Sequence, residues 1–365
     1  MATETISLAR GAPSADLLPV EAVRTATAKV LESDWEAALS YGGGGGHPGL
    51  QEWIADRHGV PTNRVMTVNG SLHGATMLFG QGLASGDVVA VEDPSYDRTL
   101  LLLEQVGAHM LTVPLDAEGM QVDNLAEQLD GGATPKLCHV IPTHHNPGGC
   151  TLSANRRRQL VDLAAEHRFA IFEDDPYADV NFEGEPPETL LSMDTADAVV
   201  YSCSFSKTVA PGMRVGYLVG PAQIISQLSK RANEQYISPN MLAQGVVSEL
   251  CHSGALDRNI ASVCEALEQR CSAMCDAVEQ LLPDAHFVQP EGGYFLWLTF
   301  PDDVDAARLA DKAAEEGVQV IKGTDFSPNA GGSSLRLSFA PVTATEAEEG
   351  VRRLASALDA VRNGA

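Results

Sequence analysis

From about residue 65, short apolar or β-branched runs alternate with amphipathic helical stretches. DVVAVEDP (87–94), KLCHVIPT (136–143), FAIFEDDP (169–176) and AVVYSCS (198–204) each have the length and composition of a strand. A helical pattern, SANRRRQLVDLAAEHR (153–168), lies between two of them, and we expect its three consecutive arginines to face solvent. This alternation predicts an α/β fold, with a mainly parallel sheet covered by helices on both sides.

After residue 220 the pattern changes to long helical stretches that continue to about residue 283. They are followed by GGYFLWLTFP (292–301), a helical pattern, and the short strand patterns VQVIKG (318–323) and SSLRLSFA (333–340). A last helix opens with a capping box from Thr343 to Glu346. These elements predict a smaller α+β domain.

The charge and the cysteines limit the classes of function. Asp and Glu number 49 against 24 Lys and Arg, a net charge of -25 that argues against a nucleic-acid partner. The N-terminus lacks a basic stretch followed by an apolar one, and no apolar run approaches the ~18 residues of a membrane span. We therefore expect no membrane partner and a cytoplasmic location. The seven cysteines are an odd number without a C-x-x-C pair, which favours reduced, mostly buried thiols over a metal site or disulfides.

Lys207 stands in SFSKT, directly after the strand pattern AVVYSCS. In open α/β sheets ligands bind beyond the carboxyl ends of the strands, and a lysine held there without its proton can form a Schiff base. Ser204, Ser206 and Arg214 have the composition of a phosphate cup. The turn NGSLHG (69–74) adds free backbone N–H groups at a helix start, which attract phosphate.

Other polar residues also follow strand patterns. Asp174 and Tyr177 lie in FEDDPY, where an aspartate could keep a pyridine nitrogen protonated, although a solvated turn would have the same composition. Asn146 in HHNPGG and Tyr96 in EDPSYD precede turns, and ordinary turn chemistry also explains them. Arg336 interrupts an apolar strand pattern, so it must meet a carboxylate, either in a structural ion pair or on a ligand.

The glycine run YGGGGGHPG (41–49) is too flexible for a strand or a helix. It predicts a loop that approaches a ligand or another chain closely.

Taken in this order, the motifs resemble the pyridoxal-phosphate-dependent aminotransferases of fold type I. The resemblance is to the class I/II branch that includes 2-aminoadipate and kynurenine aminotransferases and the effector domains of MocR-like regulators. It extends from RGAPSADLLP (10–19) to LRLSFA (335–340). It implies a seven-stranded-type sheet in a large domain, residues 41–245, a small C-terminal domain, residues 246–365, and an N-terminal segment, residues 1–40, that packs with the small domain.

The resemblance also implies the cofactor, pyridoxal 5'-phosphate, and a role for each residue. Lys207 would form the Schiff base and move the proton, Asp174 would pair with the ring nitrogen, and Tyr96 would stack on the ring. The remaining roles are contacts to the phenolic oxygen (Tyr177 and Asn146), to the phosphate (Gly70, Ser71, Leu72, Ser204, Ser206 and Arg214, with Tyr41 from a second subunit) and to the substrate α-carboxylate (Arg336, near Asn146). The catalytic residues would be Lys207, Asp174 and Tyr177, in a homodimer with shared active sites.

The sequence departs from the family pattern near the expected substrate site. The motif that usually reads Asn-Pro-Thr-Gly is NPGG, His144 and His145 stand where a glutamine often precedes the asparagine, and His73 stands in the phosphate turn. The predicted function is transfer of an amino group between an α-amino acid and a 2-oxo acid. Elimination or replacement at the β or γ carbon is the alternative, and the histidines could serve it as acid or base groups. A cofactor-sensing regulator is not expected, because no basic winged-helix domain precedes these motifs.

Overall fold

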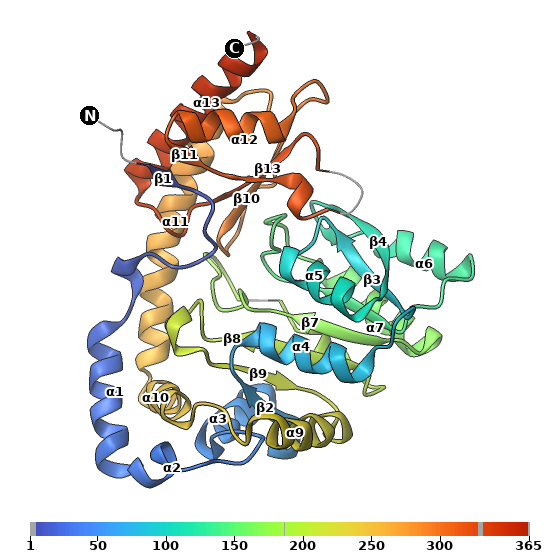
Figure 1. The fold of residues 1–365 in the computed structure, drawn as a ribbon, viewed down its shortest axis with the longest axis vertical. Helices are drawn as coiled ribbons and strands as arrows, with labels where there is room; N and C mark the ends of the chain where they lie inside the picture. Colours follow the sequence, from blue (N-terminus) through green and yellow to red (C-terminus); the bar gives the residue numbers. More distant parts are fainter. Residues whose placement is uncertain (1–4, 186, 328–330, 364–365) are drawn as a thin grey trace.

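The computed structural model describes residues 5–185, 187–327 and 331–363. Its large sheet has the strand order β2-β9-β8-β7-β6-β3-β4-β5 (Figure 1). The strands are β2 (Val65–Val68), β3 (Val88–Asp93), β4 (His109–Asp116), β5 (Gly119–Met120), β6 (Leu137–Val140), β7 (Ala170–Asp174), β8 (Val199–Ser204) and β9 (Gly216–Val219). From β8 to β4 all neighbours are parallel, whereas β9 is antiparallel to both β2 and β8. The predicted α/β fold is confirmed, with seven strands extended by the two-residue β5, which turns back on β4.

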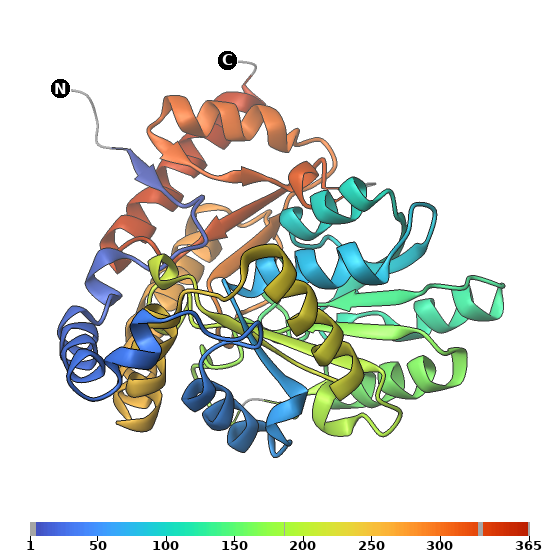
Figure 2. The ribbon, with the colours of Figure 1, turned by 60° about the horizontal axis from the view of Figure 1, so that its bottom comes forward.

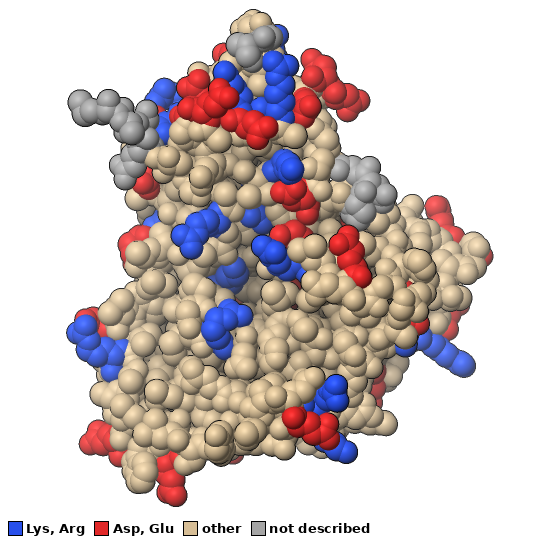
Figure 3. Space-filling view, viewed as in Figure 1, with Lys and Arg blue, Asp and Glu red and all other residues tan. Residues whose placement is uncertain are grey.

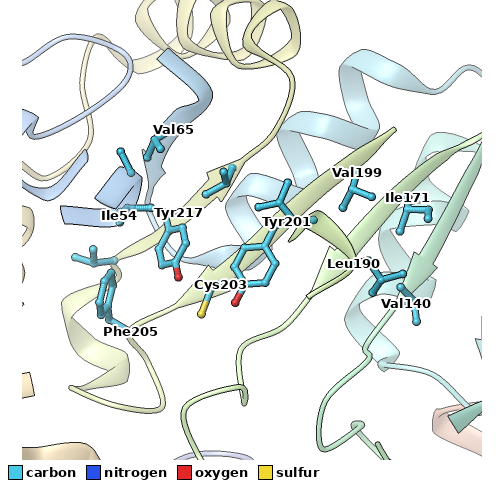
Figure 4. Close-up of a cluster of buried hydrophobic side chains, with 14 of the residues drawn as sticks. Ile54, Val65, Val140, Ile171, Leu190, Val199, Tyr201, Cys203, Phe205 and Tyr217 are labelled. Atoms are coloured by element: carbon cyan, nitrogen blue, oxygen red, sulfur yellow. The ribbon is translucent and has the colours of Figure 1, made fainter. Parts of the chain in front are cut away.

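Alternate side chains of the strands enter two separate cores. Val89 and Val91 pack on one face with helices α4, α5 and α9, whereas Ala90 packs on the other with α3, α6, α7, α8 and α10. Figure 4 shows part of this second core, in which Tyr201 and Tyr217 project from the neighbouring strands β8 and β9. The helices are α3 (Pro48–His58), α4 (Ser71–Gly82), α5 (Asp97–Val106), α6 (Val122–Asp130), α7 (Ala154–His167), α8 (Leu190–Met193), α9 (Ala222–Tyr236) and α10 (Met241–His252). Because both faces are covered, the central strands are buried on both sides, and most of their side chains are apolar.

A smaller sheet, with the order β10-β13-β12, packs with three helices at the other end of the molecule (Figures 1 and 2). Its elements are β10 (Phe295–Thr299), β12 (Ile321–Lys322), β13 (Ser334–Ser338), α11 (Ala255–Leu281), α12 (Ala306–Glu315) and α13 (Ala344–Arg362). The predicted capping box at Thr343 and Glu346 opens α13. The α+β character expected for this part of the chain is therefore present.

The N-terminal segment contacts both parts. Its strand β1 (Ile6–Ser7) pairs in parallel with β11 (Val318–Gln319), and Leu8 is buried in the core of the small sheet. Helix α1 (Val20–Ser33) instead packs against α10, and α2 (Trp35–Leu39) follows it. The domain boundaries at residues 40 and 245 stay a prediction. The outer ends of the first and last predicted domains, Met1 and Ala365, lie outside the described residues.

One prediction for α7 was wrong. Of the three arginines expected to face solvent, Arg157 is fully buried, and its guanidinium donates to the carbonyls of Leu152, Pro142 and Glu188 and to the hydroxyl of Thr143. Two of these acceptors, the carbonyl of Leu152 and the hydroxyl of Thr143, belong to buried residues in the segment between β6 and α7. A cation on the inner side of the helix satisfies them, which the sequence of the helix alone does not reveal.

Two expectations from composition can be compared with the structure. Six of the seven cysteines are buried and Cys264 is intermediate, in agreement with the prediction of mostly buried thiols. Among the helices of the described residues, none combines the length and the apolar character that crossing a membrane requires.

Candidate active site

The structure brings most of the predicted site residues together around one cavity of about 250 Å³. The cavity lies beyond the carboxyl ends of β6, β7 and β8, where the parallel strands meet at the same edge of the sheet. Its lining comprises Ser71, Leu72, Tyr96, Ile141, Asn146, Asp174, Pro176, Tyr177, Ser204, Ser206, Lys207, Pro211 and Arg214. Figure 3 shows one face of the molecule, with Lys and Arg side chains gathered around the hollow in its middle, although the chain carries a net charge of -25.

Lys207 lies three positions after the end of β8. Its amine donates a hydrogen bond of 2.6 Å to the carbonyl of Gly11, and it lies 5.3 Å and 5.0 Å from the ring centres of Tyr177 and Tyr294. Burial lowers the pKa of this amine to about 8, helped by the positive charges of Arg336 and Arg214 and opposed by Asp174. A lysine in this environment is neutral in a large fraction of molecules near pH 8, as a nucleophile or base requires.

One end of the cavity presents hydroxyl, guanidinium and backbone N–H donors. The hydroxyls of Ser204 and Ser206 are 2.8 Å apart, and Arg214 donates to the carbonyl of Asn69 in the turn before α4. Gly70 in this turn has a φ of 87°, and a Cβ there would lie 2.4 Å from Nη2 of Arg214. Only glycine therefore lets the guanidinium lie against the start of α4, where the free N–H groups attract an anion.

Asp174 ends β7 at the floor of the cavity and is 8% exposed. Its Oδ1 is buried and finds no hydrogen-bond partner among the described residues. Its Oδ2 lies 3.8 Å from Nε2 of His139, a fully buried residue of β6 that sequence reasoning missed. In the sequence, His139 could have been noticed as a polar residue inside the apolar run KLCHVIPT. A buried acceptor without a donor is free to receive a hydrogen bond from a ligand.

Arg336 of β13 lies beside the cavity, on the side of the small sheet, and contacts its lining residue Asn146. Its Nη1 donates to Oδ1 of Asn146 at 3.0 Å, and its guanidinium lies between the rings of Phe295 and Phe326, 4.3 Å and 4.6 Å from their centres. Its Nε is buried without a hydrogen-bond partner among the described residues. The arginine is thus held by two flat rings, the side-chain amide of Asn146 and the carbonyl of Ala9, and no carboxylate pairs with it among the described ion pairs.

Two aromatic rings and one backbone segment complete the site and were not predicted from the sequence. Phe295 and Phe326 hold Arg336, and the segment from Ala9 to Gly11 crosses the site, because Ala9 accepts from Nη2 of Arg336 and Gly11 accepts from Lys207. Phe295 lies in a strand, where an aromatic residue ordinarily indicates a core, and Phe326 follows a short helical turn, so neither residue carried a separate signal in the sequence.

Tyr41 is the predicted site residue that the structure keeps apart from the cavity, since it is 83% exposed. The glycine run after it is a loop, as predicted, and it approaches other segments of the same chain. A Cβ on Gly44 would lie 2.0 Å from the carbonyl of Ser229, and Gly46 has a φ of 96° against Thr67. The loop is therefore fixed where it leaves Tyr41 on the surface.

The three histidines noted in the sequence do not line this cavity in the described part of the chain. His73 packs against Tyr236 with ring centres 5.2 Å apart, and burial lowers its pKa. His144 is buried with Nε2 3.2 Å from Oδ1 of Asn181, and burial lowers its pKa to about 4. His145 forms a buried pair with Glu92. The structure thus gives no support to histidines as acid or base groups at the cavity.

Comparison with known proteins identifies relatives over nearly the whole chain. The family model described as aminotransferase class I and II matches residues 3–354. An aromatic-amino-acid aminotransferase of Thermococcus litoralis is 33% identical over 98% of this chain and 88% of its own length. A 2-aminoadipate transaminase of Thermus thermophilus is 31% identical over 97% and 90%. The crystal structure of kynurenine aminotransferase from Pyrococcus horikoshii, in complex with PMP, superposes with a TM-score of 0.94 at 31% identity, over 98% of this chain and 91% of that one.

Proposed function

Because the chain belongs to the class I and II aminotransferases, it is a pyridoxal-phosphate-dependent aminotransferase, and we propose that Lys207 is the residue that attaches the cofactor. The enzyme moves an amino group between an α-amino acid and a 2-oxo acid. One observation carries the assignment of Lys207: its enclosed amine, with a pKa lowered to about 8, lies in the same cavity as the unpartnered carboxylate oxygen of Asp174 and the donors around Arg214. Elimination or replacement is not favoured, since these relatives are aminotransferases.

The residues around the cavity fit the cofactor. Oδ1 of Asp174 would accept from its ring nitrogen, and Tyr177 and Asn146 would contact its phenolic oxygen. The phosphate would lie in the cup of Ser204, Ser206 and Arg214, with the backbone of Gly70, Ser71 and Leu72, and Tyr96 would cover the ring. When bound, the cofactor supplies an electron-accepting ring that stabilises negative charge at the α-carbon of the substrate.

The proton transfer is assigned to Lys207. Its Nζ would accept the proton from the substrate α-carbon, because an amine with a pKa of about 8 is neutral often enough at physiological pH to act as a base. Tyr177 and Tyr294 enclose the amine and keep bulk water from it. Burial, together with the neighbouring charges of Arg336 and Arg214, keeps the pKa of the amine low.

Arg336 would bind the α-carboxylate of the substrate. Its guanidinium is charged, lies in the site and pairs with no protein carboxylate within the described residues, so a substrate acid would supply the missing anion. The relatives are named for aromatic amino acids, 2-aminoadipate and kynurenine, and these are the first substrates to assay.

Reduction with sodium borohydride followed by peptide mass spectrometry tests the assignment of Lys207. The holoenzyme should carry the reduced cofactor on the peptide that contains Lys207, and Lys207→Ala should lose both this label and turnover. Label on another lysine, or full turnover in Lys207→Ala, would overturn the proposal.

A homodimer with shared active sites is the second part of the proposal. Tyr41 is 83% exposed, and it lies next to Leu39 and near Trp35, which are 63% and 56% exposed. Large apolar side chains gathered on a surface in this way mark an interface. We expect Tyr41 to reach the phosphate of a partner subunit, so Tyr41→Phe should weaken cofactor binding in the dimer. A fully active monomer in light scattering at assay concentration would contradict this.

A cytoplasmic location is the remaining part of the proposal. It is supported by the cysteines, since all seven are free thiols and six of them are buried, as is usual in a reducing compartment. Immunodetection in cell fractions tests it, and a signal confined to a secreted or membrane fraction would contradict it.

A further inference from the structure

His145 and Glu92 form a buried pair beside the active site. Nε2 of His145 lies 3.0 Å from Oε2 of Glu92, and each side chain is only 1% exposed. Neither residue lines the cavity, and neither has a part in the chemistry proposed above. Burying a carboxylate and an imidazole together is costly unless both are hydrogen-bonded, so their surroundings indicate what they hold in place.

His145 fastens the turn that carries Asn146. Its backbone N–H donates to the carbonyl of Cys150 at 2.8 Å, and its carbonyl accepts from the N–H of Gly149 at 2.7 Å. Its ring nitrogen Nδ1 accepts from the N–H of Gly148 at 3.0 Å. Since Nδ1 must be an acceptor here, the ring proton is on Nε2, which donates to Glu92.

The residue two positions after Asn146 matches this ring. A Cβ on Gly148 would lie 3.1 Å from Nδ1 of His145, closer than side-chain carbons normally pack. The two departures from the family pattern, a histidine at position 145 and a glycine at position 148, therefore depend on each other. The ring of His145 occupies the space that a side chain at position 148 would need, and it accepts a hydrogen bond from the backbone N–H of Gly148.

Glu92 connects this turn to the sheet. It lies in β3, and its Oε2 also accepts from the N–H of Ile141, which follows β6 and lines the cavity. Its Oε1 finds no partner among the described residues. His145 is thus one of two donors to this carboxylate, and the carboxylate in turn ties the ring to two central strands.

We propose that His145 is a positioning residue for recognition of the substrate carboxylate. Through the turn it places Asn146, whose Oδ1 accepts from Nη1 of Arg336 at 3.0 Å. If the turn loosens, Asn146 can move away from Arg336. The guanidinium then loses the hydrogen bond to the Asn146 amide that orients it toward a carboxylate. This inference rests on the proposed role of Arg336 and adds the residues that aim it.

The holoenzyme variants His145→Leu and His145→Gln test the inference. Leucine keeps the approximate volume and removes both ring bonds, whereas glutamine keeps an amide that can hydrogen-bond to Glu92 or Gly148. His145→Leu should raise KM for the amino acid about tenfold with little change in the single-turnover rate with n-propylamine, which has no carboxylate. His145→Gln should restore most of the KM. Equal losses with both substrates, or no loss in His145→Leu, would overturn the inference.

Two further variants keep the test decisive. If leucine beside the unpaired Glu92 prevents folding, the double variant Glu92→Met/His145→Leu removes both polar partners and should still show the same selective rise in KM. Arg336→Lys separates the two ideas. If it affects the amino acid and n-propylamine equally, the proposed role of Arg336 fails; if it is selective and the His145 variants are not, only the role of His145 fails.

Discussion

The hydroxyl of Tyr294 donates a hydrogen bond of 3.0 Å to the backbone carbonyl of Lys207. Tyr294 is fully buried and directly precedes β10, so the small sheet holds the main chain of the proposed cofactor lysine. Its ring centre lies 5.0 Å from the amine of the same lysine. The position of the small sheet and the position of the amine are therefore coupled through one tyrosine.

Tyr294→Phe keeps this ring and removes the hydrogen bond. We expect the free energy of unfolding to fall by about 1 kcal/mol and kcat to fall by about threefold to tenfold, because the lysine backbone gains freedom. Urea unfolding and steady-state kinetics measure the two effects. Tyr217→Phe is the control, since that hydroxyl lies 3.2 Å from His58, outside the cavity, and its loss should change stability alone. An unchanged kcat in Tyr294→Phe would limit the hydroxyl to a role in stability.

The lowered pKa of Lys207 predicts how cofactor attachment depends on pH. Burial and the charges of Arg336 and Arg214 bring the pKa of the amine down to about 8, so the neutral fraction increases as pH rises toward that value. After the cofactor is removed, its rate of reattachment should rise about tenfold per pH unit below pH 8 and level off above it. Stopped-flow absorbance over pH 6 to about 10 measures this rate. A rate still rising tenfold per unit at pH 10 would mean that the amine has an ordinary pKa.

Asp174→Asn should separate cofactor binding from turnover. The phosphate cup is untouched, so the variant should retain the cofactor on dialysis, while turnover falls by about a hundredfold or more because the ring nitrogen loses its anionic partner. Asp175→Asn is the matched control, since Asp175 does not line the cavity in the described structure. Absorbance reports cofactor content and a coupled assay reports turnover. Equal turnover in wild type and Asp174→Asn would exclude the proposed role of this carboxylate.

Arg336→Lys should impair recognition of the α-carboxylate. The two rings at 4.3 Å and 4.6 Å hold a flat guanidinium, and an ammonium group can reproduce neither this packing nor the fork. A loss on the order of 2 to 4 kcal/mol corresponds to a rise in KM of about 30-fold to 1000-fold. Steady-state kinetics with amino acids, compared with n-propylamine, measures it. A loss shared by both substrates would make Arg336 a structural residue.

The sequence alone carried much of the fold and most of the proposed site. The alternation of strand and helix patterns predicted the parallel sheet. The polar residues that follow its strands lie together at one edge, because parallel strands end at the same edge. Lys207, Asp174 and Asn146 were accessible to this argument, since each follows an apolar run.

What could not be predicted depends on contacts between distant segments. Glu92 and His145 are 53 positions apart, and a glutamate at the end of an apolar strand gave no hint of its partner. Gly11 and Lys207 are 196 positions apart. The burial of Arg157 was not predicted because three consecutive arginines do not show which of them faces inward. Only the carbonyls that surround Arg157 in the fold distinguish it from its neighbours.

Arg157 gives the last prediction, which concerns stability. Its guanidinium is buried with four hydrogen-bond acceptors and lies 4.0 Å from Glu173. Arg157→Met removes the side-chain donor to the buried carbonyl of Leu152 and the cation beside two buried carboxyls, Glu173 and Asp175, so the free energy of unfolding should fall by about 3 to 5 kcal/mol. Arg156→Met, at the preceding position, removes a partly exposed pair with Asp116 and a hydrogen bond to the carbonyl of Gly119, and should cost about 1 kcal/mol or less.

The loss in Arg157→Met should also depend on pH. Burial raises the pKa of Glu173 to about 8 and that of Asp175 to about 6, and Arg157 opposes both shifts. A carboxyl whose pKa is higher in the folded state binds more protons there, so it reduces stability as pH rises from the unfolded pKa to the folded one. Without the arginine both folded pKa values rise further, and the variant should lose more stability at pH 8 than at pH 5. Urea unfolding at these two pH values measures the difference, and a loss independent of pH would mean that Arg157 serves the carbonyls alone.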